Sequence, residues 1–397
     1  MNKENTIVPK LRFPEFVNEG EWQIRSFDEL FEIGNGRDYK HLDKGEIPVY
    51  GSGGYMLSVN DYLYDGESVC IGRKGTIDKP MFLSGKFWTV DTLFYTHSFK
   101  DCLPKYIHYV FQNIDWLKHN EAGGVPSLSK TNIYKIETLV PKPAEQQKIA
   151  SCLSSLDELI AAHTNKLEAL KDHKKGLMQQ LFPAEGETLP KLRFKEFEKD
   201  GEWIETILGE VSKFVRGPFG GALKKEIFVS KGYAVYEQSH AIYNVFDEFR
   251  YFVNEDKYKE MKRFAIKAGD IIMSCSGTMG KFAIIPENFK LGVINQALLK
   301  LTVKKEYSID FIKSILELPI NQEQILSQAG GGAIKNVASV SILQEIKIKI
   351  PLIEEQAKIT SCMSSIDDEI TAQTQKIETF KEHKKGLMQG LFPVINE

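Results

Sequence analysis

The sequence predicts an α+β protein with a pseudo-twofold internal repeat, in which two mixed α/β domains are separated by two long antiparallel coiled-coil helices. Three observations predict this class. A short and a long segment each occur twice in the 397 residues, the long segment has a strict heptad pattern, and the blocks between the repeats mix strand-like runs with turn signals. A chain of this length also exceeds the roughly 100 to 200 residues of a single domain.

The repeats divide the chain into four segments. Residues 9–22 read PKLRFPEFVNEGEW and residues 190–203 read PKLRFKEFEKDGEW, so each half begins with a similar arm. The longer repeat aligns 141–183 with 351–393 without a gap, and 26 of the 43 positions are identical. The predicted order is an N-terminal arm and first domain at 1–140, a first conserved helix at 141–183, a linker arm and second domain at 184–350, and a second conserved helix at 351–397.

The variable blocks, residues 23–140 and 204–350, are rich in Gly, Tyr, Phe and Val in short runs between turn signals, which indicates mixed α/β domains with several short strands. Their mutual likeness is weak but ordered. DGESVCIGRKGTIDKP in the first parallels AGDIIMSCSGTMGKFAIIP in the second, and the segment containing AGGVPSLSK parallels the one containing AGGGAIKNV. Each block is large enough to fold alone.

Apolar residues in the long repeats recur at alternating spacings of four and three, which predicts two helices packed as a coiled coil. About 37 residues at 1.5 Å each give a rod of roughly 55 Å. The predicted helix-pair core is Ile149, Leu153, Leu156, Ile160, His163, Leu167 and Leu170 in the first helix, and Ile359, Met363, Ile366, Ile370, Gln373, Ile377 and Phe380 in the second.

A duplicated chain most naturally folds about a pseudo-twofold axis, which makes the two helices antiparallel. The polar core positions His163 and Gln373 would then meet near the helix midpoints, where a hydrogen bond between them would fix the register. The alternative is that both side chains simply reach solvent. Lys174 and Lys384 fall near the helix ends, where we expect their long stems to extend into water.

Composition is typical of a globular protein, with 42% hydrophobic and 26% charged residues. No apolar run approaches the roughly 18 residues of a membrane span, and the N-terminus lacks a signal-peptide core, so we expect a cytoplasmic protein. The five cysteines are scattered without a CxxC pair, which argues against a disulfide framework or structural zinc.

The net charge of −3 conceals a difference between the two domains. Residues 23–140 carry 13 basic and 15 acidic residues, whereas residues 204–350 carry 20 basic and 16 acidic residues.

Motifs for catalysis are missing. The sequence has no GxxxxGK[ST] loop for a nucleoside triphosphate and no [ND]PP[YF] methyltransferase motif, and GSGGYM at 51–56 fails the dinucleotide fingerprint. Glu345-Ile346-Lys347 has the ExK form of a nuclease but lies in an amphipathic strand pattern with no Pro-Asp shortly upstream. The eight histidines form no triad or metal pattern. We therefore expect a chain that is not an enzyme by itself, with no metal or cofactor of its own.

The duplicated plan is nevertheless specific. Two variable domains alternating with two conserved helices, the entry arm PKLRFPEF, the helix starts AEQQKI and EEQAKI, and the endings HKKGLMQ resemble the DNA specificity subunit of type I restriction-modification systems. The resemblance covers essentially the whole chain. It implies two target recognition domains, each reading one half of an asymmetric bipartite site in double-stranded DNA, with a spacing set by the helix pair.

The resemblance also implies partners. Two methyltransferase subunits, and restriction subunits in the full complex, would assemble on this chain and would carry the S-adenosylmethionine, ATP and Mg²⁺ chemistry. Two competing hypotheses remain open. One is a coiled-coil scaffold whose globular domains bind protein partners rather than DNA, and the other is a self-contained endonuclease or methyltransferase.

Candidate DNA-binding residues follow from chemistry, because DNA readers need cations for phosphates and planar or hydroxyl side chains for base edges. In the first domain the leading candidate is the Gly-flanked basic loop with Arg73, Lys74, Thr76 and Lys79. Secondary candidates are Arg37, Tyr39, Lys40, Tyr50, Ser52, Ser129, Lys130 and Asn132. For each of them, a place in an ordinary solvated turn is the alternative.

The corresponding loop of the second domain is rich in hydroxyl groups where the first is basic, as expected if the two domains read different bases. Its candidates are Ser274, Ser276, Thr278 and Lys281. Further candidates are Arg216, Lys224 and Lys225 around a Gly-rich loop, Gln238 and His240 as base-reading side chains, and Lys335 and Asn336 after a run of glycines. A plain surface role is the alternative for all of these residues.

Overall fold

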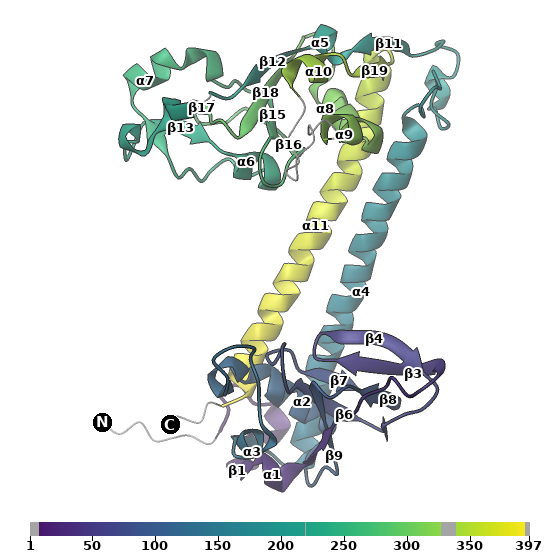
Figure 1. Cartoon of the computed structure of the whole chain (residues 1–397), viewed down its shortest axis with the longest axis vertical. Coiled ribbons are helices and arrows are strands. Elements are labelled where there is room, and N and C mark those ends of the chain that lie inside the picture. Colours follow the sequence, from purple (N-terminus) through teal and green to yellow (C-terminus); the bar gives the residue numbers. More distant parts are fainter. Residues whose placement is uncertain (1–7, 219, 327–338, 394–397) are drawn as a thin grey trace. The chain divides into compact units, whose positions relative to one another are not determined.

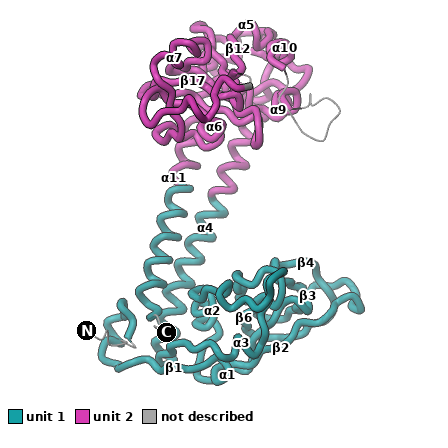
Figure 2. The backbone as a smooth tube through the Cα atoms, turned by 60° about the vertical axis from the view of Figure 1, so that its left-hand side comes forward, with its two compact units in different colours: residues 1–166, 373–397 teal, residues 167–372 magenta. Residues whose placement is uncertain are grey.

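The computed structural model describes residues 8–218, 220–326 and 339–393. The chain divides into two compact units, one formed by residues up to 166 together with those from 373 onward, and the other by residues 167–372 (Figure 2). Each unit therefore contains one globular domain and a part of each long helix. No helix in the described part of the chain is long and apolar enough to span a membrane.

The first unit contains one strand pair and two four-stranded sheets (Figure 1). The pair joins β1 (Gln23–Ser26) to β10 (Glu137–Val140). One sheet has the order β2 (Glu32–Asn35), β9 (Leu93–His97), β6 (Ser68–Gly72), β7 (Met81–Leu83). The other has the order β4 (Gly54–Val59), β3 (Lys44–Gly51), β8 (Lys86–Thr89), β5 (Tyr64–Asp65). The helices of this domain are α1 (Phe27–Leu30), α2 (Pro104–Asn113) and α3 (Lys130–Tyr134), with 3₁₀ turns η1 (Pro14–Phe16) and η2 (Trp116–His119).

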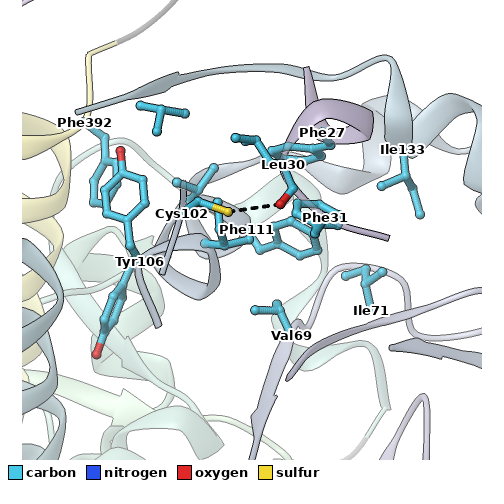
Figure 3. Packing of buried hydrophobic residues seen from close by; sticks show 14 of the residues in the cluster. Phe27, Leu30, Phe31, Val69, Ile71, Cys102, Tyr106, Phe111, Ile133 and Phe392 are labelled. Carbon is cyan, nitrogen blue, oxygen red and sulfur yellow. Dashed lines mark hydrogen bonds between the residues drawn. The ribbon is translucent and has the colours of Figure 1, made fainter. Parts of the chain in front are cut away.

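The core of this domain is built from the buried strand β6 and a cluster of aromatic side chains. Every residue of β6 is buried, as expected of a strand covered on both faces. Phe27, Phe31 and Phe111 pack against one another, with ring centroids 5.1 to 5.8 Å apart, near Val69 and Ile71 of β6 (Figure 3). The Cys102 thiol donates to the Leu30 carbonyl at 3.3 Å, and burial raises the pKa of this thiol to about 11. The cysteine is therefore a packing residue held as a thiol.

The second unit repeats this plan. Its strand pair joins β11 (Ile204–Ile207) to β19 (Lys347–Ile350). Its four-stranded sheet has the order β12 (Ser212–Arg216), β18 (Leu298–Val303), β15 (Ile271–Ser274), β16 (Phe282–Ile284), and a three-stranded sheet has the order β14 (Phe252–Val253), β13 (Tyr233–Tyr236), β17 (Gly292–Ile294). The helices are α5 (Leu208–Val211), α6 (Gln238–Tyr243), α7 (Glu255–Glu260), α8 (Ile309–Glu317), α9 (Pro319–Leu326) and α10 (Val340–Gln344), with 3₁₀ turns η3 (Lys195–Phe197), η4 (Gly220–Leu223), η5 (Lys225–Ile227) and η6 (Lys262–Phe264).

The two domains share the topology of one sheet and differ in the other. The four-stranded sheets β2-β9-β6-β7 and β12-β18-β15-β16 have the same strand order, and in each domain one strand pair of the other sheet is parallel. Among the described residues, that other sheet has four strands in the first domain and three in the second. One difference follows β3 in the first domain, where the long β4 completes a hairpin; in the second domain α6 follows β13 directly. Glu345, which the sequence placed in a strand, instead ends α10, and β19 begins at Lys347.

The long repeats form two helices of 39 residues, α4 (Pro143–Leu181) and α11 (Ile353–Leu391). In the first unit, Lys384 Nζ donates to Asp157 Oδ1 at 2.6 Å, and the Gln373 amide donates to His163 Nδ1 at 2.7 Å. Rising numbers in α4 therefore meet falling numbers in α11, so the two segments of this unit run in opposite directions. The hydrogen bond expected between His163 and Gln373 is present.

Every heptad position named above is buried or half-buried. Ile149, Leu153, Leu167, Ile359, Met363, Ile366, Gln373 and Ile377 are buried, whereas Leu156, Ile160, His163, Leu170, Ile370 and Phe380 are half-buried. The expectation for the two lysines needs correction. Lys174 and Lys384 do not extend freely into water, because each ends in an ion pair with an aspartate of the other helix within its own unit, Asp367 and Asp157 respectively.

The repeated arms dock on the helix starts. Arg12 makes two hydrogen bonds of 2.8 Å to the Glu145 carboxylate, and its remaining nitrogen donates to the Gly20 carbonyl. Arg193 repeats this arrangement with Glu355 in the second unit, at 2.9 and 2.7 Å. Both pairs are almost fully buried. The identical Arg of the two arms and the identical Glu of the two helix starts are thus explained by one contact made twice.

Candidate nucleic-acid interface

Strand ends of the first domain gather at one edge, and loops continue from them. The chain leaves β2 after Asn35, β3 after Gly51, β6 after Gly72 and β8 after Thr89. Backbone hydrogen bonds connect these strand ends. The Gly36 amide donates to the Leu93 carbonyl at 3.2 Å, the Val90 amide donates to the Tyr50 carbonyl at 3.0 Å, and the Arg73 amide donates to the Thr92 carbonyl at 2.8 Å. We call this edge the first rim, made of residues 35–37, 50–52, 73–76, 89–92 and 127–130.

The first rim joins two loops that are far apart in the sequence. The Leu128 amide donates to the Arg73 carbonyl and the Gly75 amide donates to the Pro126 carbonyl, both at 2.9 Å. An open cleft of about 680 Å³ lies between the loops. Among its lining residues are Arg73, Lys74, Ser129 and Lys130, four of the residues predicted to contact DNA.

The electrostatics of this cleft favour an anion. Burial lowers the pKa of Lys130, and the positive charge of Arg73 lowers it further, so the two cations face each other without compensation. The Lys130 ammonium donates to the Ile33 carbonyl at 2.5 Å, which holds it in place. Within the described residues, neither Arg73 nor Lys74 has a carboxylate within 4 Å.

One carboxylate does lie in the cleft. Glu121 accepts hydrogen bonds from the Ser129 amide and hydroxyl at 2.9 and 2.8 Å, and these bonds lower the pKa of the Glu121 carboxyl. The Ser129 oxygen in turn accepts from the Asn132 amide and caps α3. Ser129 and Asn132 therefore shape the loop, while the cations present the charge.

The remaining candidates of the first domain lie around the same edge. Arg37 and Lys40 are exposed, and the Arg37 carbonyl accepts from the Trp88 indole at 2.8 Å. Tyr39, Tyr50, Ser52 and Thr76 are half-buried, and Lys79 is exposed beyond the loop. Gly72 is required here, because a Cβ at that position would lie 1.9 Å from the Thr76 carbonyl oxygen.

The second domain has an equivalent edge. Three backbone hydrogen bonds define it. The Gly217 amide donates to the Leu298 carbonyl at 2.9 Å, the Asn295 amide donates to the Tyr236 carbonyl at 2.9 Å, and the Cys275 amide donates to the Ala297 carbonyl at 2.8 Å. They are the counterparts of the three bonds that define the first rim. We call residues 216–218, 236–238, 275–278 and 295–297 the second rim. These bonds align Arg73 with Cys275, Lys74 with Ser276, and Ser52 with Gln238.

Apart from Arg216 and Glu237, the second rim carries neutral hydrogen-bonding groups. The Ser276 hydroxyl donates to the Gln238 amide oxygen at 2.8 Å, and Ser276 and Thr278 are exposed. Ser274 is fully buried; its hydroxyl donates to the Thr278 carbonyl and accepts from the Lys281 amide, so it closes the turn. Arg216 is half-buried and Lys281 is exposed.

Some residues of the second domain that were predicted to contact DNA lie outside the second rim. His240 is 4% exposed, and both its ring nitrogens lie at 3.0 to 3.1 Å from backbone atoms of residues 237 and 248, so the ring caps α6 and is not available to a base. Lys224 and Lys225 are exposed beside η4 and η5. Lys335 and Asn336 lie outside the described residues.

Sequence reasoning missed three contributors to the first rim. Asn35 and Glu121 line the cleft, and Thr92 accepts the bonds that hold the basic loop. Nothing in the spacing along the chain marks them, since they come from three different connections. Across residues 8–218, 220–326 and 339–393, no group of three or more His, Cys, Asp or Glu side chains is arranged to hold a metal ion.

Comparison with known proteins agrees with the duplicated plan. The family model described as "Type I restriction modification DNA specificity domain" matches residues 19–172 and again residues 201–381. The type I restriction enzyme MjaVIII specificity subunit of Methanocaldococcus jannaschii is 26% identical over 353 residues, covering 85% of this chain and 79% of that protein. A putative type I restriction enzyme specificity subunit of Haemophilus influenzae is 24% identical and covers 81% and 80%.

Two solved structures share the fold. The S subunit of a type I restriction-modification system from M. genitalium superposes with a TM-score of 0.63 at 16% identity, covering 98% of this chain and all of that one. A chain from a structure that addresses complex assembly and conformational transition of a type I restriction-modification system gives a TM-score of 0.56 at 13% identity, covering 92% and 96%.

Proposed function

Because this chain belongs to the family of type I restriction-modification DNA specificity proteins, we propose that it binds double-stranded DNA and that each domain reads one half of a bipartite site. Members of the family are non-catalytic specificity subunits, and catalysis belongs to partner subunits. The candidate DNA-binding residues of the two rims remain proposals at the level of single side chains.

The observation that carries this proposal is the pair of equivalent rims with unequal chemistry. Two edges built from the same backbone hydrogen bonds carry the exposed cations Arg73 and Lys74 in one domain, and the buried Cys275 and the exposed hydroxyl of Ser276 in the other. Since base edges are read by side-chain donors and acceptors, unlike rims read unlike sequences. The proposed site is therefore asymmetric.

The proposed spacer is the helix pair, acting as an antiparallel coiled coil about a pseudo-twofold axis. Each helix of 39 residues is about 58 Å long, comparable to one or two turns of B-DNA at about 34 Å per turn. The bond between Gln373 and His163 supports a fixed register, because a polar pair within an apolar seam disfavours slippage.

Partners complete the proposed activity. Specificity subunits of type I systems assemble with methyltransferase and restriction subunits and bind DNA. We propose two methyltransferase subunits for this chain, one for each copy of the repeated arm and helix. S-adenosylmethionine, ATP and Mg²⁺ would be bound by the partners.

The test is to co-express the chain with a type I methyltransferase subunit and to map the modified adenines by sequencing. A gapped, asymmetric motif is the expected result, and methylation without a gapped motif, or none, would contradict the proposal. Binding of the complex to proteins but not to DNA would favour the protein-scaffold hypothesis. Deleting one heptad from a helix should change the gap or abolish assembly, and an unchanged gap in an active complex would refute the spacer role.

A further inference from the structure

The tip of the β3–β4 hairpin exposes two apolar side chains beside the first rim. Tyr55 is 63% exposed and Met56 is 49% exposed. Both residues follow the two-residue turn at Ser52 and Gly53. Figure 1 shows the hairpin at the margin of the first domain, and Figure 2 shows it there from a second direction.

A β-bulge causes this double exposure. Val49 pairs with Leu57 and Tyr50 pairs with Tyr55, so Met56 has no partner on β3. In a regular strand adjacent side chains point to opposite faces, and one of the two would be turned inward. The extra residue resets this alternation and turns both side chains outward, as bulges commonly do beside functional sites.

The exposed pair is continuous with the basic part of the rim. A Cβ at Gly75 would meet the Ser52 hydroxyl at 3.2 Å, so the hairpin turn lies against the loop that carries Arg73 and Lys74. A hollow of about 800 Å³ is lined by Tyr55 and Met56 together with Lys40, Lys44 and one carboxylate, Asp43. The cations of this hollow and of the Arg73 loop therefore lie near the apolar tip and outnumber that carboxylate.

This arrangement fits a DNA duplex better than an apolar partner. Major grooves admit a two-stranded β-ribbon, and apolar side chains there contact the C5-methyl group of thymine. The flanking cations suit the phosphates on either side of the groove. Single exposed apolar residues need no explanation, but an adjacent pair turned out by a bulge between basic loops does.

We propose that the β3–β4 hairpin tip is the base-reading element of the first domain, with Tyr55 and Met56 contacting thymine methyl groups in the major groove. Arg73 and Lys74 hold the neighbouring phosphates. In the described residues of the second domain, α6 follows β13 where the first domain has this hairpin, and Gln238, at the start of α6, occupies the position that corresponds to Ser52, so its half-site is read by other chemistry. This inference rests on the proposed function and names the reading residues of one half-site.

The experiment uses the complex with methyltransferase subunits and the motif found by adenine mapping. Duplexes in which uracil replaces each thymine of one half-site lack the methyl group. The unmodified complex should bind such a duplex about fourfold more weakly for each contacted methyl. The double variant Tyr55→Ala and Met56→Ala should bind thymine and uracil duplexes equally and should accept more than one base pair at that position.

The outcomes separate the two proposals. A Leu117→Ala variant, which truncates an equally exposed side chain in η2, should behave like the unmodified complex. If the double variant keeps the same motif and the same response to uracil, or loses affinity equally on all sequences, the hairpin inference is wrong while the proposed function stands. If the unmodified complex has no gapped motif, the proposed function fails and the inference falls with it.

Discussion

The two domains distribute their charge in opposite ways. Residues 23–140 are slightly acidic, with 13 basic and 15 acidic residues, yet the first rim carries Arg37, Arg73, Lys74 and Lys130. Residues 204–350 are basic, with 20 and 16, yet the matching positions are Pro218, Cys275, Ser276 and Val340. Net charge therefore does not locate an interface, because phosphate affinity depends on where the cations gather. The second rim keeps one cation, Arg216, so we propose that the first domain supplies most, but not all, of the phosphate anchoring.

The largest expected effect is a loss of stability when the contact between an arm and its helix is broken. Breaking a buried ion pair leaves an uncompensated charge, so Arg12→Ala and Arg193→Ala should each lower the free energy of unfolding by about 3 to 5 kcal/mol. The loss should be greater for Arg193, because the Trp22 indole still donates to Glu145 at 3.2 Å whereas the Trp203 indole has no partner among the described residues.

Urea unfolding of the full chain, followed by hydrogen exchange in each unit, measures both losses. Arg25→Ala is the control, since both carboxylate partners of Arg25, Glu29 and Asp101, are exposed and its ion pairs should contribute less than about 1 kcal/mol. Losses below 1 kcal/mol in both arm variants would show that the docking contact does not stabilise the fold.

Acid should unfold the first unit before the second. Burial, helped by the charges of Lys105 and Lys384, lowers the pKa of His108 to about 4. The unfolded chain binds this proton more readily, so stability is complete above about pH 6.5 and falls as the pH drops toward 4, by roughly 2 kcal/mol at pH 5. Lys313 stands at the matching place in α8 and pairs with Glu317, so the second unit lacks this sensitivity.

Hydrogen exchange at pH 7 and pH 5 measures the difference between the units. His108→Leu should remove most of it, since the side chain is buried and its Nδ1 has no hydrogen-bond partner among the residues that the structure describes. Equal acid sensitivity of the two units in the unmodified chain would contradict the prediction.

The salt dependence of DNA affinity should differ between variants of the first rim and variants of the second rim. Arg73→Ala with Lys74→Ala removes two cations, so the slope of log affinity against log salt should fall by about 1.8, and affinity at 0.15 M salt should drop roughly 10- to 30-fold. Thr278→Ala in the second rim should alter sequence preference without changing the slope. Fluorescence anisotropy of the methyltransferase complex at several salt concentrations measures both. An equal change of slope in the two variants would remove the distinction between the domains.

The smallest expected effect is a gain in DNA affinity at the second rim. Ser276→Lys places a cation on an exposed position of the second rim that matches Lys74. One added phosphate contact should steepen the salt slope by about 0.9 and strengthen non-specific binding roughly fivefold at 0.15 M salt. The same titration detects it, with Glu255→Gln in α7 as a control, because it also raises the net charge by one unit but lies away from the rim. If the control has an equal effect, the rim has no special position relative to DNA.

Much of the fold could be predicted because its signals are local. The predicted helix segments at 141–183 and 351–397 each begin two residues before the observed helix, since heptad spacing and flanking prolines mark helices directly. The first segment ends two residues after its helix, and the second continues past Leu391 to residues outside the described part of the chain. The candidate loops were found for the same reason, as glycines beside polar residues are visible in sequence. The partners of buried polar side chains were not, and Lys174, Lys384 and His240 were each expected to face water or DNA.

The sequence by itself determined that the chain is a duplication and where its long helices lie, because repeats and periodicity are properties of order along the chain. It left open whether His163 and Gln373 meet or both reach solvent, and the structure decided that they meet. Only the tertiary structure decided that the loop of Arg73 meets the loop of Lys130, and that Arg12 is held by Glu145. Such contacts join residues separated by whole strands or domains, so they depend on strand order and burial. The chemistry of the first rim exists only where that packing brings the loops together.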